Sequence, residues 1–190
     1  MGDPKRQKKK YQTPRFPWRT DVLQEELRLI GQYGLRNKRE LWRHRTTLSK
    51  FRGISRSLVG RSAEERDKDE KMLLTRLKKL GIVHETAVLD DVLDSAIEDI
   101  LERRLQTIIF RKGLARSVYQ ARQLITHGHI SIGPQRITVP SYLVPRDEEN
   151  LIAYTPSSRV SNPDHPMRQT MAAVAATKNK VEGESELGRQ

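Results

Sequence analysis

The sequence predicts an α+β protein, in which an N-terminal helical scaffold precedes a small domain made of two helices and an antiparallel sheet. Apolar residues recur every three or four positions through most of residues 20–126, which is the period of an α-helix. After His129 apolar and polar residues alternate, which is typical of strands. The two ends show neither period and are expected to be extended tails. The expected parts are a basic extended arm at residues 1–19, the helical scaffold at 20–103, the helix-and-sheet domain at 104–156, and an extended or disordered C-terminal tail at 157–190.

The arm combines positive charge with aromatic rings. Five lysines and arginines fall within residues 5–10, and Tyr11, Phe16 and Trp18 follow among prolines. Such a segment cannot bury enough apolar surface to fold alone, so we expect it to be disordered until it binds a partner. A solubilising tail or a nuclear-import signal is the alternative, but neither needs three aromatic rings, which can stack on nucleic-acid bases.

Four helices are expected in the scaffold. Leu23, Leu27 and Ile30 share one helical face in the first of them, which stops at a glycine. The second and third begin with Asn37 and Ser62, good capping residues that are each followed three positions later by Glu. The expected ranges are 20–33, 37–58, 62–81 and 90–100.

The chain carries a net charge of +12, which points to a polyanionic partner and favours nucleic acid over a membrane. Residues 1–60 hold 16 lysines and arginines against 5 aspartates and glutamates. Glu40 is the only carboxylate within the second helix, so its many cations are available for phosphate, although a solvated helix face is the plainer explanation. Residues 61–100 hold 7 basic against 11 acidic residues, and we expect this face to point away from RNA, toward solvent or a basic neighbouring protein.

Two short helices separated by a basic corner follow the scaffold. Leu105, Ile108 and Ile109 recur at helical spacing up to a glycine stop. The second helix opens with Ser117 and Gln120, a capping box, and continues through a buried face of Ala121, Leu124 and Ile125. The opposite face then carries an aromatic ring, a guanidinium and an amide, groups that can contact phosphates and base edges. These outward residues are Tyr119, Arg122, Gln123 and Thr126.

Three strands are expected after the helices. Ile130 and Ile132 alternate with a serine, and Ile137 and Val139 alternate with a threonine after a Gly-Pro-Gln turn. A third strand is expected at 151–154, after an acidic turn. A small antiparallel sheet packed against the two helices is the economical arrangement.

Several motifs in this region resemble the RNA-binding domain named after the universal small-subunit ribosomal protein number four. They are Arg104-Leu105, Gly113-Leu114-Ala115, Ser117, the run from Ala121 to Ile125, His127-Gly128-His129-Ile130, and Pro140-Ser141-Tyr142. Some RNA-modifying relatives of this domain carry Asp where this chain has Gln106. The resemblance agrees with the helix-and-sheet fold expected from the sequence pattern.

The resemblance extends over roughly residues 1–156, which look like the archaeal form of that ribosomal protein family. The stretches that carry it include Tyr33 to Lys38, Glu40 to Arg43 and Asp99 to Thr107. It implies a primary binder of small-subunit (16S-type) ribosomal RNA that nucleates assembly of the body of the subunit. It also implies contact with the neighbouring small-subunit protein number five, an influence on decoding accuracy, and a cytoplasmic, ribosome-bound location.

The residues expected to contact RNA come from both parts of the chain. Those of the arm and scaffold are Lys8, Lys9, Lys10, Tyr11, Arg15, Trp18, Arg36, Lys38, Arg39, Arg43, Arg45 and Arg52. Those of the helix-and-sheet domain are Arg104, Arg111, Lys112, Arg116, Ser117, Tyr119, Gln120, Arg122, Gln123, His127 and His129.

We expect no catalytic residue, no metal site, no cofactor and no small-molecule substrate. The chain has no cysteine and five scattered histidines, and it lacks a phosphate-cradling glycine loop, a nucleophile elbow and a His-Glu-x-x-His motif. It has no apolar run long enough to span a membrane, and its basic N-terminus has no signal-peptide core. Two alternatives remain open, a biogenesis factor of the small-subunit processome and an RNA-modifying enzyme fragment that uses the same RNA-binding domain.

Overall fold

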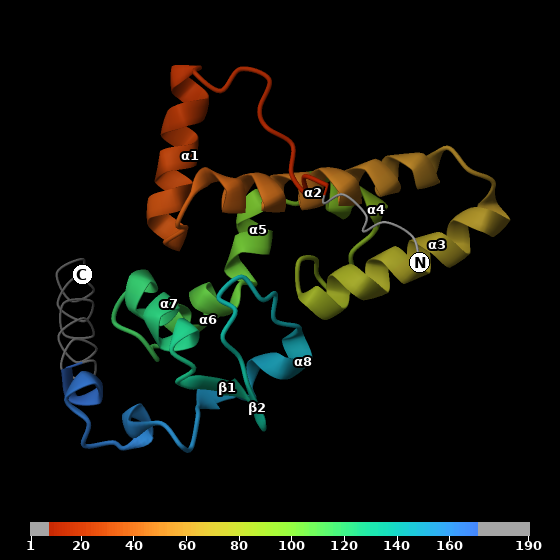
Figure 1. Ribbon diagram of the computed structural model, residues 1–190. Helices are drawn as coiled ribbons and strands as arrows, with labels where there is room; N and C mark the ends of the chain where they lie inside the picture. Colours follow the sequence, from red (N-terminus) through yellow and green to blue (C-terminus); the bar gives the residue numbers. More distant parts are fainter. Residues whose placement is uncertain (1–7, 171–190) are drawn as a thin grey trace, which may run out of the picture. The chain divides into compact units, whose positions relative to one another are not determined.

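The computed structural model describes residues 8–170, without the side chains of residues 63–65. The chain divides into two compact units (Figure 1). The first, the helical unit, consists of residues up to 78 together with 82–101, and the second consists of residues 79–81 and those from 102 onward. Each unit has its own cluster of buried apolar residues.

Five helices begin in the helical unit, of which α3 and α5 end in residues assigned to the second unit. They are α1 (Thr20–Tyr33), α2 (Lys38–Val59), α3 (Ala63–Leu80), α4 (Leu89–Asp94) and α5 (Ile97–Glu102). The predicted C-terminus of α1 and N-terminus of α2 are confirmed. Gly34 takes a left-handed conformation with φ 57° after α1, and the Asn37 side chain accepts a hydrogen bond from the backbone N–H of Glu40 at the start of α2. The predicted capping partner of Ser62 lies outside the described side chains, although α3 does begin directly after Ser62.

The prediction of a single helix over residues 90–100 was wrong, because the chain breaks between α4 and α5. The Ser95 hydroxyl donates to the Val92 carbonyl, and the Asp99 carboxylate accepts a hydrogen bond from the Ala96 amide. Short polar side chains that bond to nearby backbone groups compete with a continuous helix in this way. Arg52 of α2 donates to the Ser95 carbonyl at 2.6 Å, and Ser55 donates to the Leu89 carbonyl at 3.1 Å, so the broken segment is held against α2.

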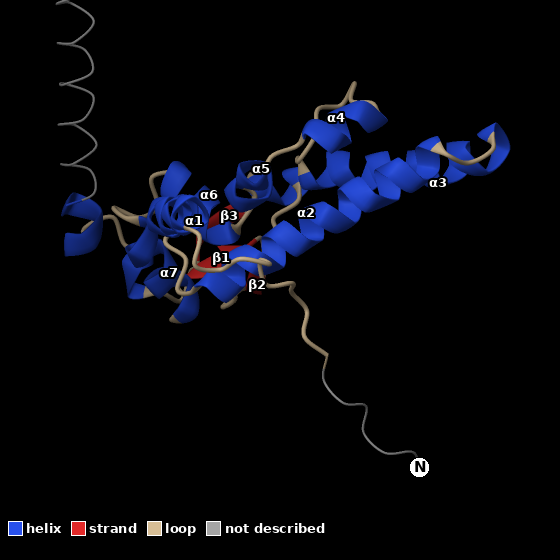
Figure 2. Ribbon diagram, turned by 90° about the horizontal axis from the view of Figure 1, so that it is seen from above, coloured by secondary structure: helices blue, strands red, loops and turns tan. Residues whose placement is uncertain are grey.

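The second unit packs short helices against a three-stranded antiparallel sheet with strand order β2-β1-β3 (Figure 2). In it, Ser131 of β1 pairs with Arg136 of β2 and with Ala153 of β3. Its complete elements are α6 (Leu105–Arg111), α7 (Val118–Thr126), β1 (Ile130–Ile132), β2 (Gln135–Arg136), α8 (Arg146–Glu149), β3 (Ile152–Tyr154) and the 3-10 turn η1 (Arg159–Ser161).

The second predicted strand is shorter than expected and lies elsewhere. Only Gln135 and Arg136 form β2, whereas Ile137 and Val139 leave the ladder after the Ile137 amide bonds to the Ile130 carbonyl. Proline at 140 has no amide hydrogen to continue a ladder, and its carbonyl instead accepts from the Gln106 amide at 3.4 Å. The chain there lies along the start of α6 rather than extending the sheet.

The Pro140-Ser141-Tyr142 segment is tied to the start of α6 and to α8. The Leu105 amide donates to the Tyr142 carbonyl at 2.8 Å, and Arg104 forms an isolated antiparallel bridge with Leu143. The Tyr142 hydroxyl donates to the Glu148 carboxylate at 2.8 Å. This hydrogen bond raises the pKa of Tyr142 above its ordinary value, because the neutral phenol is the donor, and burial and the carboxylate charge act in the same direction.

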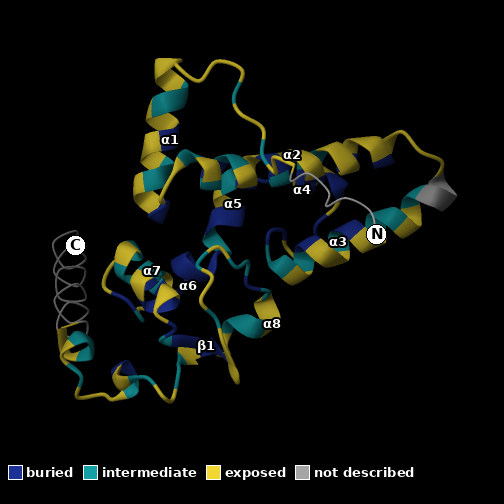
Figure 3. Ribbon diagram, viewed as in Figure 1, coloured by how far each residue is buried: buried dark blue, intermediate teal, exposed yellow. Residues whose placement is uncertain are grey.

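The apolar core of the second unit lies between α6, α7 and the sheet. Figure 3 shows buried residues on α6 and β1, while α7 exposes one of its sides. Ser131 is buried together with its two isoleucine neighbours, so β1 is covered on both faces rather than on one. The buried residues of this core are Leu105, Ile108, Ile109, Ala115, Ala121, Leu124, Ile125, Ile130, Ile132, Val144, Ile152 and Val160.

The packed part of the second unit continues beyond residue 156, where the sequence analysis placed the start of a tail. Val160 belongs to the core, and Met167 packs against it. The Arg168 guanidinium lies 5.3 Å from the centre of the Tyr154 ring. Burial raises the pKa of Tyr154, while the charge of Arg168 lowers it in part. The remainder of the predicted tail, residues 171–190, lies outside the described residues.

Replacing Leu124 by Ala should destabilise the second unit, because the side chain is only 3% exposed and the substitution leaves a cavity. The expected loss is about 2–5 kcal/mol in the free energy of unfolding, measured by urea denaturation. Gln123→Ala, one position earlier on the exposed side of α7, is the control and should change stability by less than about 0.5 kcal/mol. Equal losses of stability from the two substitutions would contradict the burial of Leu124 and the exposure of Gln123 on α7.

Candidate nucleic-acid interface

The exposed side of α7 carries the groups expected from the sequence. The predicted orientation is confirmed, because Ala121, Leu124 and Ile125 are buried while Gln123 and Thr126 are exposed. Tyr119 is 62% exposed, which is unusual for a ring of its size and leaves one face open for stacking. This helix therefore presents an aromatic ring and an amide side by side to solvent.

The start of α7 is held by a reciprocal pair of side chains. The Ser117 hydroxyl accepts a hydrogen bond from the backbone N–H of Gln120 at 3.2 Å. The side-chain oxygen of Gln120 accepts one from the backbone N–H of Arg116 at 2.6 Å. This is the capping box that the sequence predicts, shifted by one residue on its return bond. Both capping side chains are thereby engaged with backbone, whereas the Arg116 side chain is exposed beside them.

Arg122 is half-buried and lies against the preceding helix rather than projecting freely. Its guanidinium stands 3.5 Å from the Gln106 side-chain oxygen. Gln106 is fully buried, and its amide nitrogen donates to the Val118 carbonyl at 3.0 Å. Gln106 therefore joins α6 to α7 and lies beside the Arg122 guanidinium.

A second cationic group, which the sequence analysis did not select, lies at the other end of α7. The Arg136 guanidinium donates to the His127 carbonyl at 3.0 Å and lies flat against Gly128, where a Cβ atom would meet it at 1.9 Å. The rings of His127 and His129 are stacked with centres 6.3 Å apart, and His129 Nδ1 lies 2.8 Å from the Ser158 hydroxyl. Arg136 reaches this place because β2 pairs with β1, a register that short alternation alone does not reveal.

Three basic residues expected to contact RNA are instead engaged within the second unit. Arg104 is a correction: its side chain is fully buried, whereas an RNA contact requires access from solvent. Arg111 forms a two-pronged ion pair with Glu102, with nitrogen to oxygen distances of 2.7 and 3.2 Å. Lys112 donates to the Glu149 carbonyl. Arg111 and Lys112 remain exposed at the surface, but they would have to give up these contacts within the unit in order to bind RNA.

In the helical unit the N-terminal arm is packed against α2. The rings of Tyr11 and Trp42 stack with centres 5.9 Å apart, and the Gln12 amide donates to the Thr46 hydroxyl at 3.0 Å. The expectation of a segment without contacts before binding is therefore not met at these residues. Residues 1–7, which complete the predicted arm, lie outside the described residues.

The arm and α2 together enclose a strongly basic hollow of about 650 Å³. The Lys9 ammonium lies 4.7 Å from the centre of the Tyr11 ring, a cation–π contact between two residues that line the hollow. Further along the arm, Trp18 is 86% exposed and Phe16 lies beside Arg15. The residues that line the hollow are Lys8, Lys9, Lys10, Tyr11, Arg43 and Thr47.

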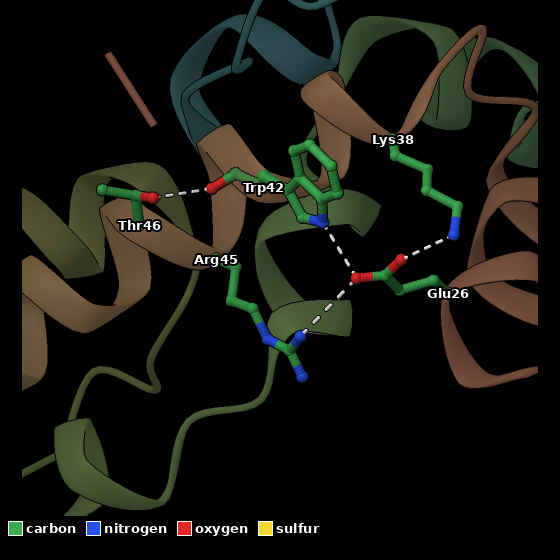
Figure 4. A network of polar contacts seen from close by, with 5 residues as sticks. All are labelled: Glu26, Lys38, Trp42, Arg45 and Thr46. Carbon is green, nitrogen blue, oxygen red and sulfur yellow. Dashed lines mark hydrogen bonds and ion pairs between the residues drawn. The ribbon is translucent and has the colours of Figure 1, made fainter. Parts of the chain in front are cut away.

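A buried carboxylate from α1 engages two of the cations predicted on α2 (Figure 4). Glu26 is only 3% exposed, and its oxygens lie 3.0 Å from Lys38 Nζ and 3.9 Å from an Arg45 nitrogen. The Trp42 indole nitrogen donates to the same carboxylate at 2.8 Å. Glu26 lies on α1, so the residues of the second helix alone do not reveal this partner. Arg36, Arg39 and Arg43 remain exposed, whereas Arg52 is half-buried and donates to a carbonyl of its own unit.

Residues 103–150 match the sequence model of the S4 domain. The chain is 54% identical over 158 residues to the small ribosomal subunit protein uS4 of Ignicoccus hospitalis, an alignment that spans 83% of this chain and 95% of the relative. It is equally similar to that of Hyperthermus butylicus, with 83% and 90% covered. Similarity to the protein of Thermoplasma acidophilum is 46% over the whole of this chain and 98% of that one.

The chain belongs to the uS4 family of small ribosomal subunit proteins. The predicted resemblance is thereby confirmed, and the match to the S4 domain covers α6, α7, β1, β2 and α8 and ends just before β3. The uS4 relatives are named as ribosomal proteins, which are structural, so the prediction that the chain is not an enzyme is also confirmed.

Two further properties hold for residues 8–170. No helix in this part of the chain is long and apolar enough to cross a membrane. Histidines and carboxylates there form no group of three or more that could hold a metal ion.

Replacing Gly128 by Ala tests the contact of the Arg136 guanidinium with the end of α7. Gly128 has φ +73°, and an added methyl group would displace the guanidinium from the end of α7. Gly133→Ala is the matched control, because Gly133 also has a positive φ, +55°, but meets nothing within 4 Å. Both should lose about 1–2 kcal/mol of stability from backbone strain. Gly128→Ala should lose about 1 kcal/mol more, from the broken hydrogen bond to the His127 carbonyl, in urea denaturation. Equal losses would show that Arg136 moves aside without cost.

Proposed function

We propose that this protein is a structural constituent of the small ribosomal subunit and binds its ribosomal RNA directly. The observation that carries the proposal is the near full-length similarity to proteins named as small ribosomal subunit proteins, together with an S4 domain whose α7 exposes a ring and an amide beside the exposed Arg116. The net charge of +12 supports a partner rich in phosphate.

The exposed side of α7 serves as the RNA-reading surface of the S4 domain. Arg116 contacts phosphate at the start of the helix, where free backbone amides also favour an anion. Tyr119 stacks on an unpaired base or packs against a ribose, and the Gln123 amide bonds to a base edge or phosphate. At the far end, His127 and Arg136 supply donors for a second phosphate.

The helical unit supplies most of the salt-dependent affinity. Its lysines and arginines outnumber its acidic residues at the N-terminal end, and several are exposed on the arm and α2. Contacts of this kind are blind to sequence and release counterions from RNA. The residues we assign to this role are Lys8, Lys9, Lys10, Arg15, Arg36, Arg39 and Arg43, with Trp18 as an additional stacking residue.

Because each unit has a basic surface of its own, one chain can hold two RNA segments at once, and binding at one raises the effective concentration at the other. This supports a role as a primary binder that nucleates assembly of the body of the subunit. The acidic stretch at residues 61–100 repels RNA and suits a basic neighbouring protein, which we take to be the small-subunit protein number five. Through such contacts the protein would contribute to translational accuracy on the ribosome in the cytoplasm.

Cosedimentation with mature small subunits in moderate salt tests this function. A resident ribosomal protein should remain with the subunits in stoichiometric amounts. A biogenesis factor should appear only on precursors, and an RNA-modifying enzyme should remain largely unbound. Either of those results would contradict the proposal.

Tyr119→Ala should weaken binding to in vitro transcribed small-subunit ribosomal RNA. The expected loss is about 1–3 kcal/mol of binding free energy, the range found for base-stacking aromatic residues, measured by filter binding. Stability should change by less than about 0.5 kcal/mol, because the ring is 62% exposed. Leu151→Ala removes a similarly exposed apolar side chain from the same unit and should leave affinity unchanged. If both variants bind like the wild type, α7 does not face RNA.

Replacing Lys8, Lys9 and Lys10 together by Ala should reduce the salt dependence of RNA binding. Loss of three phosphate contacts should lower the magnitude of the slope of log affinity against log salt by about 2–3. The measurement is a series of binding titrations at increasing potassium chloride concentration. Replacement of three basic residues of α3, namely Lys68, Lys71 and Arg76, by Ala provides a charge-matched control, which should leave the slope unchanged because this helix begins with a run of acidic residues. An unchanged slope in the arm variant would place these lysines away from phosphate.

A further inference from the structure

The Glu26 side chain contradicts a simple electrostatic account of the helical unit. A protein that binds a polyanion gains nothing electrostatically from a carboxylate beside its binding surface. Yet Glu26 is 3% exposed at the side-chain level and lies among two cations and an indole on α2. A buried charge of this kind persists only where its partners compensate for the lost hydration, so its position is well determined.

The contacts of Glu26 lead from α1 to the arm through one side chain. Trp42 donates its indole hydrogen to the carboxylate at 2.8 Å (Figure 4). Its ring also stacks on Tyr11, with ring centres 5.9 Å apart. The Thr46 hydroxyl donates to the Trp42 carbonyl at 2.7 Å and accepts from the Gln12 amide at 3.0 Å. The arm is therefore anchored at Tyr11 and Gln12, directly after its three consecutive lysines.

We propose that Glu26 is a positioning residue for RNA binding, which fixes Trp42 so that Tyr11 holds the lysines of the arm around a preformed phosphate-binding hollow. The hollow of about 650 Å³ is lined by Lys8, Lys9 and Lys10 of the arm and by Arg43 of α2. It suits the phosphodiester backbone of an RNA strand, because four cations converge there and Thr47 adds a hydroxyl at the wall. This inference rests on the proposed RNA-binding function.

Preorganisation explains why an acidic residue should favour binding to RNA. A loose arm loses conformational entropy when it is ordered on RNA, and that cost reduces affinity. An arm already held on α2 has met most of this cost during folding. Removing the carboxylate therefore has two opposite effects, a gain from reduced repulsion and a loss from the freed arm, and we expect the loss to be the larger.

The test compares Glu26→Ala with Glu25→Ala, its exposed neighbour on the same helix. Both variants remove one negative charge and leave a good helix former. Binding to in vitro transcribed small-subunit ribosomal RNA should weaken about three- to tenfold in Glu26→Ala, a coupling typical of contacting residues. In Glu25→Ala it should be unchanged or slightly tighter. If the wild type binds this RNA and the two variants have equal affinities, this inference alone is overturned. If the wild type itself does not bind, the proposed function is overturned as well.

A double-mutant cycle in the full-length chain separates positioning from a general structural defect. Glu26→Ala should cost little further affinity when Lys8, Lys9 and Lys10 are already Ala, because the positioned charges are gone. Additive losses would show that Glu26 does not act through the arm. If Glu26→Ala fails to fold by circular dichroism, Trp42→Phe takes its place in the cycle, since it removes the indole donor but keeps an aromatic ring.

A measurement without RNA tests the anchoring itself. In a Trp18→Phe background Trp42 is the only tryptophan, so acrylamide quenching of its fluorescence measures how accessible this ring is to solvent. Quenching should increase in Glu26→Ala and in Tyr11→Ala, but not in Glu25→Ala. Equal quenching in all four proteins would show that the carboxylate and the arm do not hold this ring.

Discussion

The burial of the apolar face of α7 is the interaction on which the S4 domain depends. Ala121, Leu124 and Ile125 are almost completely withdrawn from water, and their burial provides the driving force that docks this helix on the sheet. Because a helix has 3.6 residues per turn, fixing this face also fixes the direction of Tyr119 and Gln123. Core packing thus sets the direction of the exposed groups, and the proposed RNA contacts of the domain depend on this packing.

The helical unit solves a different problem, since its cations would repel one another if they were brought together without compensation. Glu26 compensates Lys38 and Arg45 from a neighbouring helix, and the Ser95 carbonyl compensates Arg52. Those cations are paired within the unit, whereas Arg39 and Arg43 are exposed at the surface of the same helix. Two classes of cation therefore occur on one helix, and sequence composition does not distinguish them.

The sequence predicts periodic features well and long-range contacts poorly. The caps at Asn37 and Ser117 and the buried face of α7 follow from residue spacing, because helix geometry is local. The position of Arg136 over Gly128 depends on strand register, and the burial of Arg104 depends on a segment some forty residues away, so neither has a local signal. Val160 was assigned to the tail for the same reason: a single apolar residue has no period, yet the core accepts it.

The bonds that tie the start of α6 to residues 142–144 have a consequence for the order of folding. The Leu105 amide bonds to the Tyr142 carbonyl, and the Val144 amide bonds to the Arg103 carbonyl. During synthesis α6 is made before these partners, so the closure of the S4 domain must await them. Contacts of such sequence separation slow folding, because loop entropy is lost before the contact forms. The helical unit also has long-range contacts, such as those of Arg52 with Ser95 and of Ser55 with Leu89, but its residues all precede residue 102, so it can form while the second unit is still incomplete.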